Sequence, residues 1–205
     1  MTRRFHLITA LCIALVIALA PHGRSFAAGT VDYASLNPSP ADLFDSSELA
    51  TLRCISTGSG VICRGSEVYP FDNTQLGSCG TSPLVANGNV TFNDTLRYDS
   101  SGNLVELSSR VDRDLTLTSA GTGRTARYMG SQTISVTPST PGDLDTAIVT
   151  KTGLTSAVIV PGQGIVYQSS GNVTFGADGS LSFHGHHDEF QGVDLVSEVC
   201  SALAA

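Results

Sequence analysis

Hydrophobic and polar residues alternate along most of the chain beyond residue 85, so that apolar side chains recur at every second position. This period of two is typical of β-strands that bury one face. One segment has Val90, Phe92, Leu96 and Tyr98 in this phase, with polar residues between them. The other apolar sets are Val105, Leu107, Val111, Leu115 and Leu117; Ala126, Tyr128, Ile134 and Val136; Leu144, Ile148, Leu154, Val158 and Val160; Ile165, Tyr167, Val173 and Phe175; and Leu181 and Phe183. Each set predicts the buried face of one strand.

The segments between these strands are short and rich in glycine. Residues 100–103, 120–123 and 161–164 have the length of four-residue hairpin loops, and residues 177–179 fit a three-residue loop. Gly58 and Ser59 fit a two-residue turn in an earlier hairpin. Neighbouring strands are therefore expected to be antiparallel, and their number is about eight.

After residue 190 the hydrophobic period lengthens to that of a helix. Apolar residues share one helical face at Leu195, Val196, Val199, Cys200 and Leu203. The predicted fold class is thus all-β, an antiparallel meander with one C-terminal helix. Because closure removes exposed edge strands, we expect the meander to close or to curl strongly into a barrel. A two-layer β-sandwich is the alternative.

The first 27 residues have the three parts of a secretory signal peptide. Arg3 and Arg4 precede an apolar stretch that is too short to span a membrane, and small residues near Ala27 fit the cleavage site. We therefore expect a secreted, extracellular protein. Residues 28–50 are expected to form an irregular N-terminal arm, and residues 51–205 a single β-barrel-like domain with the C-terminal helix.

Acidic residues outnumber basic residues in the mature chain. Three of the 11 basic residues lie in the signal peptide and all 18 acidic residues lie beyond it, which leaves eight basic residues and a net charge of −10. Such a surface does not neutralise phosphates, so the composition argues against nucleic acid as a partner. It argues equally against binding to an anionic membrane after signal removal. Composition does not define the oligomeric state.

Four cysteines remain after signal removal, and an even number in an exported chain predicts two disulfides. The turn at Gly58 and Ser59 places Cys54 opposite Cys63 in a hairpin, and Cys79 is then left for Cys200. The alternative is a metal site, but the four thiols lack the paired C-x-x-C spacing that such a site usually has.

Several short motifs in combination resemble an uncharacterised family of small secreted bacterial proteins. The motifs are Cys54, Cys63-Arg64-Gly65, Cys79-Gly80, residues 99–103, Pro161-Gly162-Gln163-Gly164, Gly176-Ala177-Asp178-Gly179, His187-Asp188 and Cys200-Ser201-Ala202-Leu203. The resemblance covers most of the mature chain. It implies export, two disulfides and a β-rich fold, and it implies no chemical activity.

Two sequence patterns associated with enzymes have little support here. Residues 121–126 match the dinucleotide pattern G-x-G-x-x-A, but that pattern binds a pyrophosphate only between a strand and a helix. Here it joins two predicted strands, so we interpret it as a turn and expect no cofactor. The sequence also lacks the G-x-S-x-G pattern of serine hydrolases.

A histidine-rich tract at residues 184–189 is the most suggestive string for metal binding. On a strand, His184, His186 and Asp188 point to one side, which could hold a transition metal. This side is opposite to that of Leu181 and Phe183, so it should face solvent. We therefore expect His184 and His186 to be exposed and to hold no structural metal.

Polar residues that fall in the buried phase of the strands are the candidate site. A polar group on a buried face is uncommon unless it is paired or functional. These residues are Asp94, Ser109, Arg113, Gln132, Ser156, Ser169 and His187. The hairpin loops place Asp94 opposite Ser109, Arg113 opposite Gly130, Gln132 opposite Val111, and Ser156, Ser169 and His187 in one row.

These residues support two interpretations. In one, Arg113 binds an anion or a carbonyl group or pairs with Asp94, and His187 with Asp94 supplies an acid and a base. In the other, the polar groups form a satisfied interior network. The leading hypothesis is a secreted, non-catalytic binding module for a small amphipathic ligand. An isomerase or hydrolase that uses the interior Asp, Arg and His residues is the first alternative, and a structural or surface-interaction protein is the second.

Overall fold

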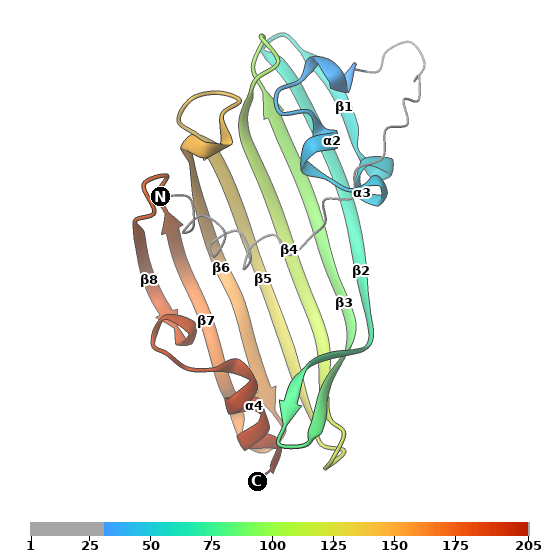
Figure 1. Cartoon of the computed structure of the whole chain (residues 1–205), viewed down its shortest axis with the longest axis vertical. Coiled ribbons are helices and arrows are strands. Elements are labelled where there is room, and N and C mark those ends of the chain that lie inside the picture. Colours follow the sequence, from blue (N-terminus) through green and yellow to red (C-terminus); the bar gives the residue numbers. More distant parts are fainter. Residues whose placement is uncertain (1–30, 205) are drawn as a thin grey trace.

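Eight β-strands form one antiparallel sheet in the computed structural model, which describes residues 31–204 (Figure 1). The strands are β1 (Arg53–Thr57), β2 (Gly60–Cys79), β3 (Ser82–Tyr98), β4 (Leu104–Ser119), β5 (Thr125–Pro138), β6 (Ala147–Val160), β7 (Gly164–Phe175) and β8 (Leu181–His187). The helices are α2 (Pro40–Leu43), α3 (Ser46–Thr51) and α4 (Leu195–Ala204), with 3₁₀ turns η1 (Tyr33–Ser35), η2 (Leu144–Thr146) and η3 (Asp188–Phe190). The predicted signal peptide lies outside the described residues.

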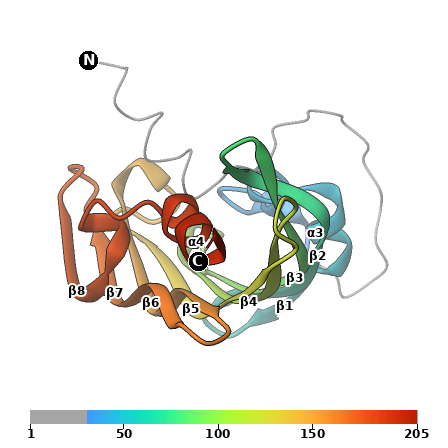
Figure 2. The same ribbon diagram turned by 90° about the horizontal axis from the view of Figure 1, so that it is seen from below.

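The sheet is a meander in which each strand pairs with its neighbours in the chain. Its order is β1 to β8 without a crossover, and β1 and β8 form its two edges. The expectation of a closed barrel is therefore wrong, and the alternative of a strongly curled sheet describes the molecule. Figure 2 shows this curl, with α4 inside the curve. We call the side that holds α4 the concave face and the other side the convex face.

Glycines on the concave face allow neighbouring strands to approach closely. Gly153, Gly171 and Gly185 face one another across β6, β7 and β8, and we call them the glycine row. A Cβ atom on Gly171 would clash with the carbonyl oxygen of His184, and one on Gly185 would clash with that of Ser170. All three glycines have φ between 113° and 127°, which other residues rarely adopt. Such glycine kinks are a known means of bending a sheet.

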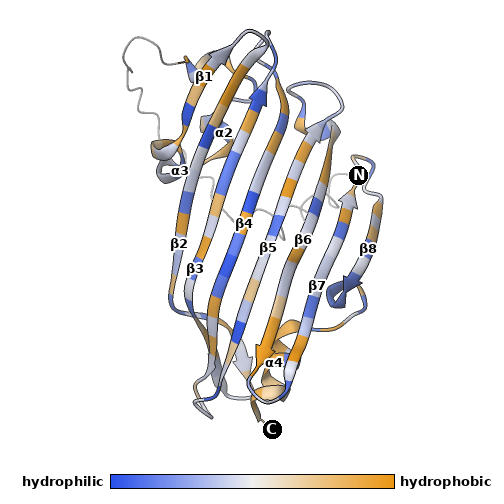
Figure 3. Cartoon of the chain, turned by 180° about the vertical axis from the view of Figure 1, so that it is seen from behind, coloured by the Kyte–Doolittle hydropathy of each residue, from blue (hydrophilic) through white to orange (hydrophobic). Residues whose placement is uncertain are grey.

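Two apolar clusters cover the concave face at opposite ends of the sheet. The first packs Val199 and Leu203 of α4 against the β3–β7 residues Leu84, Ala86, Val90, Val111, Leu115, Leu117, Ala126, Val158, Val160 and Tyr167. The second packs the arm residues Leu36 and Leu52 against Cys63, Leu96, Tyr98 and Leu104. The predicted alternation is visible as bands of opposite hydropathy along the central strands (Figure 3). Each cluster is a separate cover for one end of the same face.

The predicted buried faces of β6 and β7 are partly wrong, because register shifts interrupt the alternation of apolar and polar residues. A shift between Leu154 and Ser156 changes the phase of β6, so that Ile148 and Leu154 lie on the convex face. Ile148 is 42% exposed and Ile165, next to a second shift, is 57% exposed. Leu144 lies in η2 and is exposed rather than part of a strand. The prediction that these residues belong to buried strand faces is therefore wrong.

Both predicted disulfides are present. Cys54 bonds to Cys63 across the β1–β2 hairpin, and Cys79 at the end of β2 bonds to Cys200 in α4. The second bond joins residues 121 positions apart and holds α4 to the sheet. No helix within residues 31–204 is long and apolar enough to cross a membrane. The two disulfides are compatible with the expected secretion.

The glycine row generates a stability prediction with an internal control. We expect Gly171→Ala to lower the free energy of unfolding by about 3 kcal/mol or more, because it combines backbone strain with a clash against β8. Gly179→Ala is the matched control, since Gly179 also has positive φ (81°) but no atom within 4 Å of the place where a Cβ would lie. It should cost only the backbone strain, roughly 1 kcal/mol. Urea unfolding of both variants measures the difference, and equal losses would show that the close approach of β7 and β8 is unimportant.

Candidate functional site

The polar residues predicted on the buried strand faces have the cross-strand partners that the hairpin loops indicated. The pairs are Asp94 with Ser109, Arg113 with Gly130, Gln132 with Val111, Ser156 with Ser169, and Ser169 with His187. Arg113 is half-buried, and the other polar side chains of this set are at most 7% exposed. All of them lie on the concave face, between the two apolar clusters.

The structure does not unite these residues in one site. Asp94 lies on β3 and His187 on β8, with four strands between them, and no hydrogen bond or ion pair joins them. The proposed acid and base are therefore not paired. The polar residues instead form one group around Arg113 and a second group around His187.

Arg113 reaches from β4 across β5 to the backbone of β6. Its Nη1 atom donates a hydrogen bond of 2.8 Å to the carbonyl oxygen of Thr155. Gly130 leaves the space for this contact, because a Cβ atom there would lie 2.5 Å from the same oxygen. With its amide oxygen turned toward the guanidinium, Gln132 accepts from Arg113 Nη2 at 2.9 Å and donates to the Thr155 hydroxyl at 3.0 Å. The expectation that Arg113 pairs with Asp94 is wrong, because these neutral groups hold the guanidinium.

Ser169, His187 and Glu189 form the second group, at the junction of β7, β8 and η3. Ser169 Oγ lies 2.5 Å from Glu189 Oε1 and 3.1 Å from His187 Nδ1, while His187 Nε2 lies 3.2 Å from the carbonyl oxygen of His184. His187 Nδ1 is also 3.4 Å from Glu189 Oε1. The residue types are those of a nucleophilic triad, but a nucleophile must reach its substrate. Ser169 is 0% and His187 1% exposed, so this geometry is that of an interior network that fixes η3 to the sheet.

The part of the concave face next to β8 carries exposed apolar side chains. Leu181 is 47% and Phe183 43% exposed, so the prediction that they form a buried strand face is wrong: they lie on the concave face, but beyond the part that α4 covers. The Phe183 ring stacks on Phe190 with centroids 4.9 Å apart. Lys151 lies in the same row as Phe183, and its Nζ atom is 5.3 Å from the ring centroid of Phe175. The sequence did not identify Lys151, because the irregular register of β6 hides its phase.

Several basic residues lack an acidic partner among the described residues. On the convex face Arg97, Arg110 and Arg127 form ion pairs with carboxylates at 3.0–3.1 Å, whereas Arg53 and Arg64, which lie opposite each other on β1 and β2, form none. On the concave face Arg113 and Lys151 have no carboxylate within ion-pair distance among residues 31–204. Two unpaired cations on one face of a strongly acidic chain are a feature that favours an anionic ligand.

His184 and His186 of the histidine tract are exposed, as predicted, while His187 is buried. His184 and His186 lie on the convex side of β8, and His186 Nε2 pairs with Asp188 Oδ1 at 2.8 Å. The described residues contain a different group of three side chains within metal-ligand reach, namely Asp45, Glu48 and Glu67. Sequence reasoning missed this group because Glu67 lies on β2 while Asp45 and Glu48 lie at the start of α3.

Local capping explains why two of these acids lie together. Asp45 Oδ1 caps α3 by accepting from the backbone N–H groups of Ser47 and Glu48, and Glu48 Oε2 accepts from the backbone N–H of Asp45. The Ser47 hydroxyl lies 2.5 Å from Asp45 Oδ1 and 2.6 Å from Glu67 Oε1. Since a serine has one hydroxyl hydrogen, it cannot serve both carboxylates. The group therefore has more acceptors than donors.

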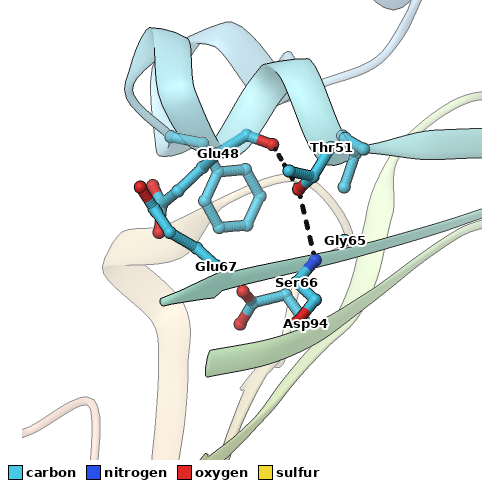
Figure 4. A pocket seen from close by; sticks show the side chains of 8 residues that line it. Glu48, Thr51, Gly65, Ser66, Glu67 and Asp94 are labelled. Carbon is cyan, nitrogen blue, oxygen red and sulfur yellow. Dashed lines mark hydrogen bonds between the residues drawn. The ribbon is translucent and has the colours of Figure 1, made fainter. Parts of the chain in front are cut away.

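Burial and mutual repulsion disfavour the charged forms of these acids. Burial raises the pKa of Glu48 to about 7, and the carboxylates of Glu67 and Asp45 contribute to the rise. Burial also raises the pKa of Asp94. The Ser109 hydroxyl opposes this rise, and the carboxylate of Glu67 adds to it. Glu48, Glu67 and Asp94 line one narrow pocket between α3 and the sheet (Figure 4).

A second hollow, with a volume of about 390 Å³, lies beside the Cys79–Cys200 disulfide. Its other lining residues are Gly80, Ser82, Ser119, Gly121, Thr122, Ser201 and Ala204. Apart from the disulfide it contains hydroxyl and backbone groups but no charged side chain, and it includes none of the predicted ligand-binding residues.

Comparisons with known proteins identify no relative. No family model, curated protein or solved structure matches the chain. The resemblance to a family of small secreted bacterial proteins therefore stays a prediction.

The contacts of Arg113 predict a specific stability loss. Arg113→Met removes the guanidinium that donates a hydrogen bond to the Thr155 carbonyl and leaves this partly buried oxygen without that donor, so the free energy of unfolding should fall by about 1.5–3 kcal/mol. Arg127→Met is the matched control, because its ion pair with Asp114 is exposed on the convex face and is worth less than about 1 kcal/mol. Urea unfolding compares the two variants, and equal losses would contradict a positioning role for Arg113.

The raised pKa of Glu48 predicts a loss of stability as pH rises. The folded protein holds the Glu48 proton up to about pH 7, whereas the unfolded chain releases it near the ordinary value of 4.5. The stability from this group is thus fully present below pH 4.5 and is lost as pH rises toward 7. Glutamine at the same position keeps the helix cap. In EDTA, Glu48→Gln should therefore lose less thermal stability than the wild type between pH 5 and pH 8, while the exposed Glu198→Gln should follow the wild type.

Proposed function

We propose that the protein is an exported, non-catalytic binding protein that holds a small amphipathic anion on the concave face of its sheet. The observation that carries this proposal is the placement of exposed apolar side chains beside an unpaired cation. Leu181 and Phe183 supply the apolar surface, and Lys151 supplies the charge. Large exposed apolar side chains that adjoin a charge of one sign are typical of binding surfaces.

The spacing of these groups limits the size of the ligand. Val173 lies between Lys151 and Phe183 in one row of the sheet, so the two side chains are two strand spacings apart, roughly 10 Å. A carboxylate, sulfonate or phosphate group attached to a flat apolar body of one or two rings fits this distance. The exposed glycine row runs parallel to this row and offers a flat backbone surface for such a body.

Burial of the nucleophile candidates makes binding a better explanation than catalysis. Ser169 and His187 are closed to solvent, and their polar atoms already contact Glu189 and the His184 carbonyl. A hydrolase that used Ser169 would need a rearrangement of η3 before a substrate could approach. Binding at Lys151 and Phe183 requires no such change.

A fluorescent amphipathic anion tests the proposal directly. The probe 8-anilino-1-naphthalenesulfonate combines a sulfonate with flat rings, and its fluorescence rises on transfer from water to an apolar surface. We expect Leu181→Ser and Lys151→Gln each to weaken its binding to the mature protein by about tenfold, since each change removes about 1.4 kcal/mol or more of contact energy.

Ile148→Ser is the matched control for Leu181→Ser. The two residues are similarly exposed, at 42% and 47%, but Ile148 lies on the convex face. Its replacement should leave the affinity unchanged. Equal weakening by both serine variants, or unchanged binding in Lys151→Gln, would refute the proposed site. Mass spectrometry of the native secreted protein would then identify any copurifying molecule independently of the probe.

A further inference from the structure

We propose that Asp45, Glu48 and Glu67 bind one calcium ion between α3 and β2, and that the ion fixes the N-terminal arm to the sheet. This site is separate from the one proposed on β6–β8, and either proposal can fail without the other. It is carried by the geometry of the three carboxylates and by the buried charge of Asp94 next to them.

The three carboxylates are arranged around a common point. One oxygen from each lies within 4.8 Å of the others, which is twice the usual calcium–oxygen distance of about 2.4 Å. One oxygen of each group accepts the hydrogen bonds of the helix cap or of Ser47. The second oxygens accept no hydrogen bond of ordinary geometry among the described residues, and that of Glu67, Oε2, is fully buried. The caps thus hold the carboxylates in place and leave one oxygen of each available to a cation.

Asp94 is a second and independent indication of a bound cation. It lies on β3 rather than in the arm, it is only 7% exposed, and it lines the same pocket as Glu48 and Glu67 (Figure 4). It makes no ion pair within residues 31–204. The opposing Ser109 hydroxyl is near, but it forms no hydrogen bond of ordinary geometry. A buried carboxylate without a partner is costly, and a cation at the adjacent cluster would offset that cost.

The nearby Tyr69 hydroxyl gives further support to a bound cation. It is buried without a hydrogen bond of ordinary geometry, and burial raises its pKa, with further contributions from the nearby carboxylates of Glu67, Glu48 and Asp45. No Arg, Lys or His side chain pairs with any acid of this cluster among the described residues. The cluster therefore concentrates negative charge that only protons or a bound cation can compensate.

The ligand set selects calcium among common cations. All candidate ligands are oxygens, which suit calcium and magnesium rather than zinc. Calcium suits the cluster better, because it accepts irregular coordination, whereas magnesium requires near-ideal octahedral geometry with oxygens about 2.1 Å away. The pocket is too narrow for an organic molecule, which leaves an ion as the candidate ligand. Water on the partly exposed side would complete the coordination.

Terbium luminescence and calorimetry test the site in the intact mature protein. Terbium(III) replaces calcium at oxygen sites and is excited by nearby tyrosine, and the chain has no tryptophan to interfere. We expect tyrosine-sensitised terbium emission that calcium displaces, and calorimetric binding of one calcium ion with a dissociation constant of about 10⁻⁴ to 10⁻³ M, as in extracellular modules. Saturating calcium should also raise the melting temperature at pH 8.

Glu67→Gln separates cation binding from simple repulsion. The variant removes one charge of the cluster, so it should be at least as stable as the wild type in EDTA, yet its calcium affinity should fall by about tenfold or more. Glu198→Gln removes an exposed charge elsewhere and should keep the wild-type affinity. Absence of calcium binding to the wild type at about 10 mM calcium, or equal binding by Glu67→Gln, would overturn the proposal. In that case the cluster is compensated by protons alone.

Discussion

The structure depends on covering one face of a single curled sheet. A closed barrel buries its inner face with its own strands, and a sandwich uses a second sheet. Here β1 and β8 remain edges, so other parts of the chain must cover the concave face. The arm with α2 and α3 covers one end and α4 covers the other. The Cys79–Cys200 bond joins α4 to β2, and the Cys54–Cys63 bond joins β2 to β1, the strand that follows the arm. Val199 and Leu203 pack this ten-residue helix on the sheet, and the Cys79–Cys200 bond adds a covalent constraint on its position.

The glycine row affects both the packing of β6, β7 and β8 and the exposure of the concave face. It lets β6, β7 and β8 approach and bend, but it also removes side chains from the middle of the concave face. The region between the covers is therefore lined by backbone, by the buried network around His187, and by the exposed side chains of Leu181 and Phe183. The same glycines that let these strands approach closely thus leave this part of the concave face exposed.

Much of this fold follows from sequence, and the exceptions have physical causes. Loop lengths fix the register of a hairpin, which is why the opposition of Arg113 and Gly130 and the pairing of Cys54 with Cys63 could be predicted. A β-bulge adds a residue without a clear sequence signal, so the phase of β6 before Ser156 was misread and Lys151 was missed. The acidic cluster could not be predicted either. Its members come from a helix cap and a strand that meet only through tertiary packing, and capping alone accounts for Asp45 and Glu48 in the sequence.

The two ends of the concave face differ in the sign of the charges that lack partners among the described residues. The mature chain is acidic, yet the four acids near α3 lack basic partners among the described residues, while Arg113 and Lys151 on the same face lack acidic ones. A chain selected only for stability would gain by pairing these charges, as it does on the convex face with Arg97, Arg110 and Arg127. Separation of unpaired charges of opposite sign on one face costs stability, and such costs are typical of sites that bind ligands. The acidic end is therefore suited to a cation that stabilises the arm, and the β6–β8 end to an anion, so that each part of the face has the sign of charge that its proposed ligand requires.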